Sequence, residues 1–157
     1  MVSHARDPEF YAGHGVPDTL DGRFELIALH LFLVLHRLRD DAAAGRFGQA
    51  LFDRMFADMD RALREMGTGD LSVGRQVKRM AQGFYGRAAA YQAGLAGERP
   101  LEEALARNLF GTVAEPDPAA LAWFAAYLRR QAAALSRVPT ATIAEGTVPF
   151  APIGAAS

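Results

Sequence analysis

Apolar residues recur every three or four positions along most of the chain, which is the period of an amphipathic helix. The first such stretch predicts a helix over about residues 20–40. Its apolar stripe consists of Phe24, Ile27, Leu31, Val34, Leu35 and Leu38. Asp18 or Thr19 is placed to cap the first turn, since both side chains can accept a hydrogen bond from a free backbone N–H. We expect Gly45 to end this helix.

Two further stripes predict a pair of longer helices joined by a tight turn. One covers about residues 47–65 and the other about residues 72–96. Gly67 lies in the connecting segment and suits the left-handed conformation that ends many helices. Gly83 and Gly86 lie inside the second helix, where each glycine costs roughly 1 kcal/mol relative to alanine. We expect this cost to be tolerated because another helix or a partner approaches closely there.

The C-terminal part predicts one short helix, one long helix and a tail. Pro100 fits the first position of the short helix. Asp117 as cap and Pro118 as first residue mark the start of the long one, and Pro139 closes it. The tail contains two more prolines, so we expect residues 140–157 to be extended or loose, with Ile143, Val148 and Phe150 as the residues that would lie across the bundle.

These elements predict an all-α fold without strands, in the form of a single compact bundle of about five helices. Residues 1–19 form an irregular lead-in, residues 20–138 the helical core, and residues 139–157 the tail. The 157 residues suit one domain that is large enough to bury a core. Because 50% of the residues are hydrophobic and only 22% are charged, the composition argues against disorder.

Composition also excludes several kinds of site and location. The chain has no cysteine, so disulfides and thiolate metal sites are excluded. The first residues lack the apolar segment of a secretory signal. The longest apolar run, residues 26–35, is about half as long as the roughly 20 residues that span a bilayer. We therefore expect no transmembrane segment, and a location in the cytoplasm or at the inner face of the membrane.

Charge is unevenly distributed, although the net charge is only −1. Residues 1–60 carry six arginines against ten acidic residues, whereas residues 61–87 carry six basic residues against two acidic ones. Such a basic stretch fits an acidic partner, RNA or anionic lipid. A solvated helix surface explains the same pattern.

The sequence contains no recognisable catalytic or metal-binding motif. It has no P-loop, no dinucleotide fingerprint after a strand and no G-x-S-x-G. His30 and His36 are six residues apart, so they point to different faces of a helix and do not chelate one metal. Asp53 and Asp60 share a helix face, but solvated charges explain them, with Asp60 in an ion pair with Arg64. We expect no enzymatic activity, no cofactor and no metal.

Two kinds of residue in the helices allow a structural and a functional interpretation. A lone histidine in an apolar helix, such as His30, is expected to be a hydrogen-bonded core residue, and a haem ligand is the alternative. Methionine packs in cores but also suits surfaces that bind varied apolar partners. The methionines concerned are Met55, Met59, Met66 and Met80.

Three ordered segments of the sequence resemble the ubiquinol–cytochrome c chaperone family. The first is Asp-Thr-Leu-Asp-Gly-Arg-Phe-Glu at residues 18–25, followed by Leu-His at residues 29–30. The second covers residues 56–71 and the third residues 73–91. Order and spacing agree over roughly residues 10–135, which makes the resemblance specific.

The resemblance implies an all-α chaperone. In the mitochondrial members it implies binding of newly made cytochrome b during assembly of ubiquinol–cytochrome c reductase (complex III), beside the ribosome and with a small partner protein. We expect this protein to lack the long N-terminal extension of those members, because its composition, rich in Ala, Arg and Gly, is typical of a bacterial, alphaproteobacterial member. We expect cytochrome b or another complex III subunit as client, with the ribosome or a small assembly partner as further contacts. Peripheral contact with the membrane fits this reading, whereas DNA binding does not.

A client with apolar membrane helices and charged loops requires a groove with an apolar floor and a charged rim. The turn around Gly67 and the flanking helices combine such residues with the family-like segments. The candidate partner-binding residues are Asp21, Arg23, His30, Arg64, Asp70, Lys78, Arg79, Met80, Tyr85, Arg87 and Tyr91. Charge reversal at Lys78 and Arg79 is expected to weaken client binding without unfolding the protein.

Three other functions remain open at the level of the sequence. His30 motivates a haem-binding or small-molecule-binding module in complex III maturation. The basic residues 61–87 motivate an adaptor that contacts the ribosome or RNA. An enzyme would require a deep pocket with convergent polar groups, for which the sequence offers no candidate.

Overall fold

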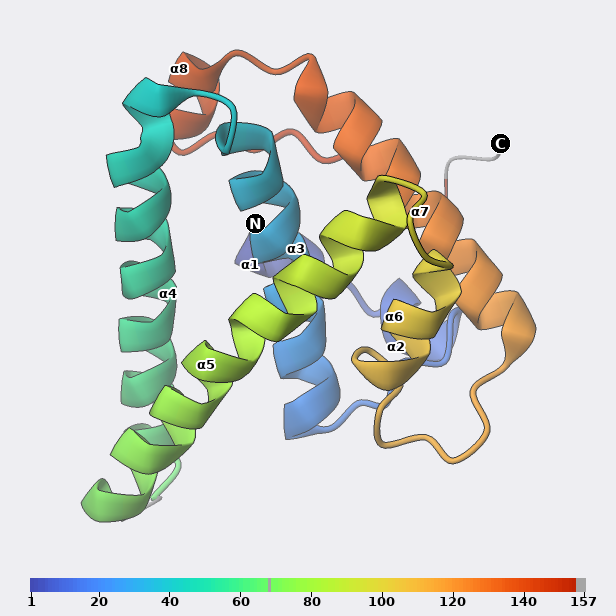
Figure 1. The fold of residues 1–157 in the computed structure, drawn as a ribbon. Coiled ribbons are helices and arrows are strands. Elements are labelled where there is room, and N and C mark those ends of the chain that lie inside the picture. Colours follow the sequence, from blue (N-terminus) through green and yellow to red (C-terminus); the bar gives the residue numbers. More distant parts are fainter. Residues whose placement is uncertain (68, 155–157) are drawn as a thin grey trace.

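The structure is a computed structural model that describes residues 1–67 and 69–154, without the side chains of Asp70 and Leu71. In this part of the chain all regular secondary structure is helical (Figure 1), which confirms the predicted all-α class. The elements are α1 (Val2–Ala5), α2 (Glu9–Ala12), α3 (Leu20–Leu38), η1 (Ala42–Ala44), α4 (Gly45–Glu65), α5 (Asp70–Leu95), α6 (Leu101–Arg107), α7 (Pro118–Ser136) and α8 (Thr140–Ala144).

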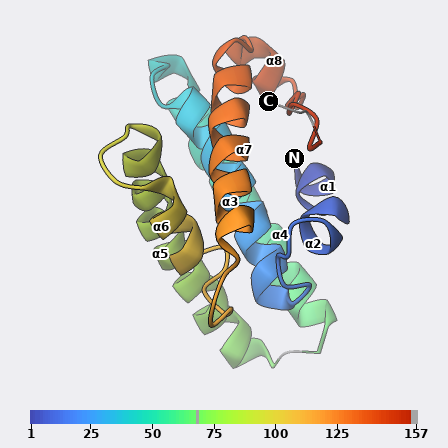
Figure 2. The same cartoon turned by 90° about the vertical axis from the view of Figure 1, so that its right-hand side faces the viewer.

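Helix α3 forms the centre of the fold. It contacts α1, α4, α5 and α7, and every residue from 28 to 34 is buried. Thr19 caps its first turn, because the side-chain oxygen accepts a hydrogen bond from the N–H of Gly22 (3.2 Å). Figure 1 shows α5 crossing in front of α3, and Figure 2 shows α7 in front of it. A helix that is packed against neighbours on several sides must be apolar on nearly all faces, and the sequence of α3 meets this requirement.

Helices α4 and α5 form a long hairpin whose turn projects at one end of the molecule (Figure 1). Gly67 has a φ of +83°, as predicted for the end of α4, and its N–H donates to the carbonyl of Arg64 (3.0 Å). Only Gly48, Met55, Phe56 and Leu63 of α4 are buried. The outer face of this helix is therefore free to carry charges.

Helix α6 bridges α5 and α7. Gly94, near the end of α5, permits its close approach, since a Cβ at this position would lie 3.0 Å from Cα of Leu101. Helix α7 begins as predicted: Pro118 is its first residue, and the carboxylate of Asp117 accepts a hydrogen bond from the N–H of Ala119 (2.9 Å).

Several predicted boundaries are wrong. The lead-in is not irregular throughout but contains α1 and α2, and the tail begins with α8. Buried Phe10 and Ile143 anchor α2 and α8 to the rest of the protein. Gly45 opens α4 instead of ending the preceding helix, which stops at Leu38, and Pro100 precedes α6 instead of being its first residue. A helix of one turn is shorter than the apolar period that would reveal it.

The close approach predicted at Gly83 and Gly86 is not a contact between helices. A Cβ at Gly86 would meet nothing within 4 Å. At Gly83 it would lie 2.6 Å from a guanidinium nitrogen of Arg87, four residues further along the same helix. Gly83 therefore makes room for the side chain of Arg87.

His30 is a core residue, as expected. Its Nδ1 lies 2.7 Å from the carbonyl oxygen of Leu26, and its Nε2 lies 2.8 Å from the hydroxyl group of Tyr127. Because a carbonyl only accepts, Nδ1 carries the proton and the hydroxyl donates to Nε2. The hydroxyl oxygen then accepts from Nε2 of His4 (2.9 Å). Burial lowers the pKa of His30 to about 3, so its ring is neutral, and the network ties α1 and α7 to α3.

Candidate functional site

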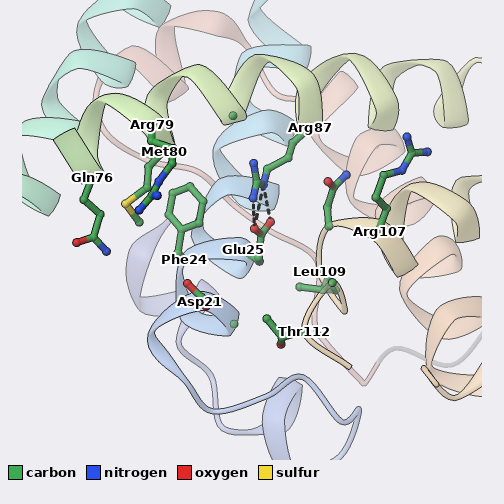
Figure 3. Close-up of a pocket in the computed structure, with 14 residues that line it drawn as sticks. Asp21, Phe24, Glu25, Gln76, Arg79, Met80, Arg87, Arg107, Leu109 and Thr112 are labelled. Atoms are coloured by element: carbon green, nitrogen blue, oxygen red, sulfur yellow. Dashed lines mark hydrogen bonds and ion pairs between the residues drawn. The ribbon is translucent and has the colours of Figure 1, made fainter. Parts of the chain in front are cut away.

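A groove with a volume of about 460 Å³ opens between α3, α5 and the end of α6. Its lining comes from the first turns of α3, one face of α5 and the residues from 107 to 112 (Figure 3). The groove is thus formed by three segments that are far apart in the sequence. As a separate finding, none of the described helices combines the length and apolarity that crossing a membrane requires.

An ion pair between Arg87 and Glu25 occupies the middle of the groove (Figure 3). Nε of Arg87 donates to both carboxylate oxygens (2.9 and 2.7 Å), and Nη2 donates a further hydrogen bond to Oε1. The guanidinium carbon lies 5.4 Å from the ring centroid of Phe24, within the range of a cation–π contact. Burial raises the pKa of Glu25, and the guanidinium acts in the opposite direction. The pair ties α3 to α5.

Two more arginines line the groove, on either side of this pair (Figure 3). Arg79 comes from α5 and Arg107 from the last turn of α6, and both are exposed. Neither makes an ion pair with any residue in the described part of the chain. Met80, which is partly exposed, contributes apolar surface between the charges, and buried Leu109 also lines the groove. The groove therefore combines apolar contact area with exposed cations.

Comparison with known proteins identifies the family of this fold. Residues 12–150 match the model of the family described as ubiquinol-cytochrome C chaperone. This chain belongs to that family. The finding confirms the resemblance seen in the sequence, and the family is one of chaperones and assembly factors, not of enzymes.

Individual relatives of this chaperone-family protein agree with that assignment. A crystal structure titled as the Cbp3 homolog from Brucella abortus matches with a TM-score of 0.82 and 35% identity, over 97% of this chain and 84% of that chain. Ubiquinol-cytochrome-c reductase complex assembly factor 1 from Xenopus laevis is 28% identical over 125 residues, which are 78% of this chain and 62% of the relative. The human protein of that name is 27% identical, over 42% of its length. The chain thus spans less than two thirds of these animal relatives.

Part of the predicted site of this chaperone-family protein lies in the groove. The predicted residues that line it are Asp21, Arg79, Met80 and Arg87. The first comes from α3 and the others from one face of α5, so the fold brings two of the family-like segments together. No comparison assigns these residues a role, and they remain candidates.

Other predicted residues lie outside the groove. Arg23 forms an exposed ion pair with Asp18 (2.7 Å). Arg64 pairs with Asp60 (2.6 Å), as expected for residues one helical turn apart. Lys78 is exposed on α5 but does not line the groove, although it is adjacent to Arg79 in the sequence. The loss of client binding expected from charge reversal at these two residues is therefore now expected from Arg79 alone.

The remaining predicted residues are buried, distant or not described. His30 and Tyr91 are completely buried, so neither presents a surface to a partner. Tyr85 is exposed and stacks on Phe52 with ring centroids 5.4 Å apart. It lines a smaller groove of about 210 Å³ that is formed mainly by the end of α3 and the first turns of α4. The side chain of Asp70 lies outside the described residues.

Sequence reasoning missed the contribution of α6 to the groove. From the sequence alone, Arg107 is an ordinary cation in the last turn of a predicted helix, where the helix dipole favours a positive charge. Glu25 lies in a family-like segment, but its partner is 62 residues away, and no local pattern indicates that pairing. Only the packing of α6 and α3 against α5 reveals both residues.

The basic stretch of residues 61–87 is partly neutralised in the fold. Arg61 lies 3.8 Å from Asp58, and Arg64 and Arg87 have the acidic partners described above. Ion pairing of this kind lowers the potential that a polyanion such as RNA would experience. It weakens the case for an RNA contact through this stretch.

The structure also bears on the alternative of a haem or metal site. Both ring nitrogens of His30 are engaged in hydrogen bonds, and its side chain is inaccessible. Among the described residues, no three acidic or histidine side chains are placed to hold a metal ion together. An axial-ligand role for His30 would require the core network around Tyr127 to break.

Proposed function

We propose that this protein is an assembly factor for complex III that binds cytochrome b before the subunit joins the complex, and that it acts by binding and not by catalysis. The observation that supports this proposal is the groove between α3, α5 and α6, which combines apolar surface with exposed arginines in a fold of the chaperone family. The names of the curated relatives, complex III assembly factors, support the same process.

The physical properties of the groove match those of such a client. A membrane subunit outside its complex presents apolar helices and charged connecting loops. Protein interfaces combine a desolvated apolar centre with a polar rim, and arginine and methionine are enriched in them. Met80 offers partly exposed apolar surface in a groove that buried Phe24 and Leu109 also line, and Arg79 and Arg107 offer the charges. Since the client is a membrane protein, we place this encounter at the inner face of the membrane.

Affinity purification from the organism's own cells tests the proposal. The tagged protein is isolated in a mild detergent, and the co-purifying proteins are identified by mass spectrometry. Cytochrome b should be enriched with the unmodified protein and reduced for the double variant Arg79→Glu, Arg107→Glu. Lys78→Glu is the matched control, because it reverses an exposed charge on the same helix outside the groove. Absence of every complex III subunit, with normal complex III levels in a deletion strain, would contradict the proposal.

A further inference from the structure

The groove holds two cations that the fold leaves available. Arg79 and Arg107 are exposed, line the same groove, and lack an ion pair within the described part of the chain. Arg87, which lies between them in Figure 3, already forms an ion pair with Glu25. The available positive charge is therefore found at two separate points and not in the middle.

Guanidinium groups at these two points suit carboxylates. An arginine side chain presents five N–H donors in a planar arrangement that matches the two oxygens of a carboxylate. Arg79 and Arg87 are eight residues apart on α5, about 12 Å along the helix axis at 1.5 Å per residue. Arg107 lies on the far side of Arg87 from Arg79 (Figure 3). A ligand that reaches both exposed arginines must therefore be extended and carry two separated anionic groups.

Apart from Asp21 and the Glu25–Arg87 pair, the groove lining between the two arginines is apolar or neutral. Met80 contributes partly exposed apolar atoms, and Asn108 contributes an amide that can donate and accept. The Glu25–Arg87 pair carries no net charge when both groups are ionised. Between its two anionic groups, a ligand would therefore place apolar or uncharged residues.

These features distinguish a peptide from a polyanion. Asp21 also lines the groove and is exposed, so it repels a continuous run of negative charge such as RNA or a sheet of anionic lipid headgroups. The groove is also bounded on three sides, by α3, by α5 and by the end of α6 with the turn that follows it, whereas a membrane surface is flat. A peptide segment can place its acidic side chains at the arginines and keep other residues near Asp21.

We propose that the groove binds an acidic peptide segment in an extended form, with one carboxylate at Arg79, another at Arg107, and apolar or neutral residues between them. The inference rests on the proposed function for the source of the segment, which is a loop or terminus of the client. The site itself is defined by the two arginines and is tested with synthetic peptides.

Titration of the ¹⁵N-labelled full chain, followed by amide NMR spectra, tests the binding site. The probes are blocked peptides with two glutamates at varied spacing and leucine and alanine elsewhere, and matched peptides with glutamine in place of glutamate. We expect saturable shifts at the amides of Arg79, Gly83, Arg107 and Gly111 for one glutamate spacing. The glutamine peptide should bind about tenfold more weakly or not at all, because it offers no charge-assisted hydrogen bonds.

Single variants assign the carboxylates to the two arginines. Arg79→Glu and Arg107→Glu should each weaken peptide binding by about tenfold, and Lys78→Glu should change it by less than about twofold. Asp21→Asn should strengthen binding, since it removes the repelling carboxylate. The charge-neutral variants Arg79→Gln and Arg107→Gln repeat the test if a reversed charge perturbs the fold, which the same spectra show.

Several results would overturn the inference. Shifts spread over the whole surface, equal binding of the glutamine peptide, or saturation of the same amides by inorganic phosphate at similar concentration would each exclude an acidic-peptide site. If cytochrome b is captured through the groove but no acidic peptide binds, this inference fails and the proposed function stands. If the peptides bind as predicted but no complex III subunit is captured, the proposed function fails and the peptide site stands.

Discussion

At the scale of single residues, two clusters of polar groups connect the helices. Arg87 and Glu25 join α5 to α3 in the middle of the groove, and Tyr127 joins α7 to the two histidines His4 and His30. Inside a protein such groups are costly mainly when a partner is missing. Both clusters therefore make testable contributions to stability.

Replacing Arg87 with methionine would leave the carboxylate of Glu25, a residue that is only 7% exposed, without its ion-pair partner. Breaking a buried ion pair by removal of one partner costs about 3–5 kcal/mol. Because Arg87 is partly exposed, we expect the free energy of unfolding in urea to fall by about 3 kcal/mol. The double variant Glu25→Leu, Arg87→Met should recover most of this loss. A double variant as unstable as the single one would show that lost packing, and not a stranded charge, is responsible.

The histidines predict a dependence of stability on pH. Burial lowers the pKa of all four, most strongly for His30, to about 3. In the unfolded chain the imidazole of His30 binds a proton near pH 6.5, whereas in the folded protein it does so only near pH 3. Stability is therefore fully present above about pH 6.5 and decreases as the pH falls below it, by up to about 1.4 kcal/mol per pH unit for this residue.

Urea unfolding between about pH 7 and pH 5 measures the slope, before most carboxylates titrate. In the same interval the ring resonances of His30 in the folded protein should stay at their neutral positions. A His30 ring that titrates within this interval would contradict the buried network with Tyr127.

At the scale of helices, two glycines of α5 should respond to alanine in opposite directions. Gly86 faces open space, so Gly86→Ala should stabilise the protein by about 0.5–1 kcal/mol through helix propensity. Gly94 is buried against Leu101, so Gly94→Ala should destabilise it by about 1–3 kcal/mol through overpacking. Thermal unfolding gives the signs. Stabilisation by both variants would contradict the close packing of α6 on α5.

The long helices could be predicted because each repeats the apolar period over several turns. Their caps could also be predicted, since Thr19 and Asp117 act on backbone groups two or three residues away. Helices α1, α2 and α8 could not be, because a single turn does not repeat the pattern. Their positions depend on tertiary contacts, such as those of buried Phe10, that a local pattern does not contain.

The groove could be predicted only in part, for a related reason. The family-like segments contain Asp21, Arg79 and Arg87, but they do not contain α6. Arg107 was therefore not predicted as a site residue. Lys78 and Arg79 are adjacent polar residues, and periodicity alone does not decide which of them lines a groove. Their placement follows from the packing of α3 and α6 on α5, which involves residues far apart in the chain.

At the scale of the whole molecule, the fold is the one shared with the Brucella abortus structure over 97% of this chain. The animal relatives are longer, and the 125 residues that match them make up 78% of this chain. We propose that this helical domain binds the client through the surface formed by α3, α5 and the end of α6.

Complementation of a deletion strain tests whether the groove is needed for assembly of complex III. The strain receives the unmodified gene, the double variant Arg79→Glu, Arg107→Glu, or Lys78→Glu, at equal protein levels, and complex III is quantified by its cytochrome spectrum and ubiquinol–cytochrome c reductase activity. The account predicts that the unmodified protein and Lys78→Glu restore complex III, whereas the double variant does not. Full restoration by a stably folded double variant would contradict a role of the groove, and unchanged complex III in the deletion strain would contradict the assembly function itself.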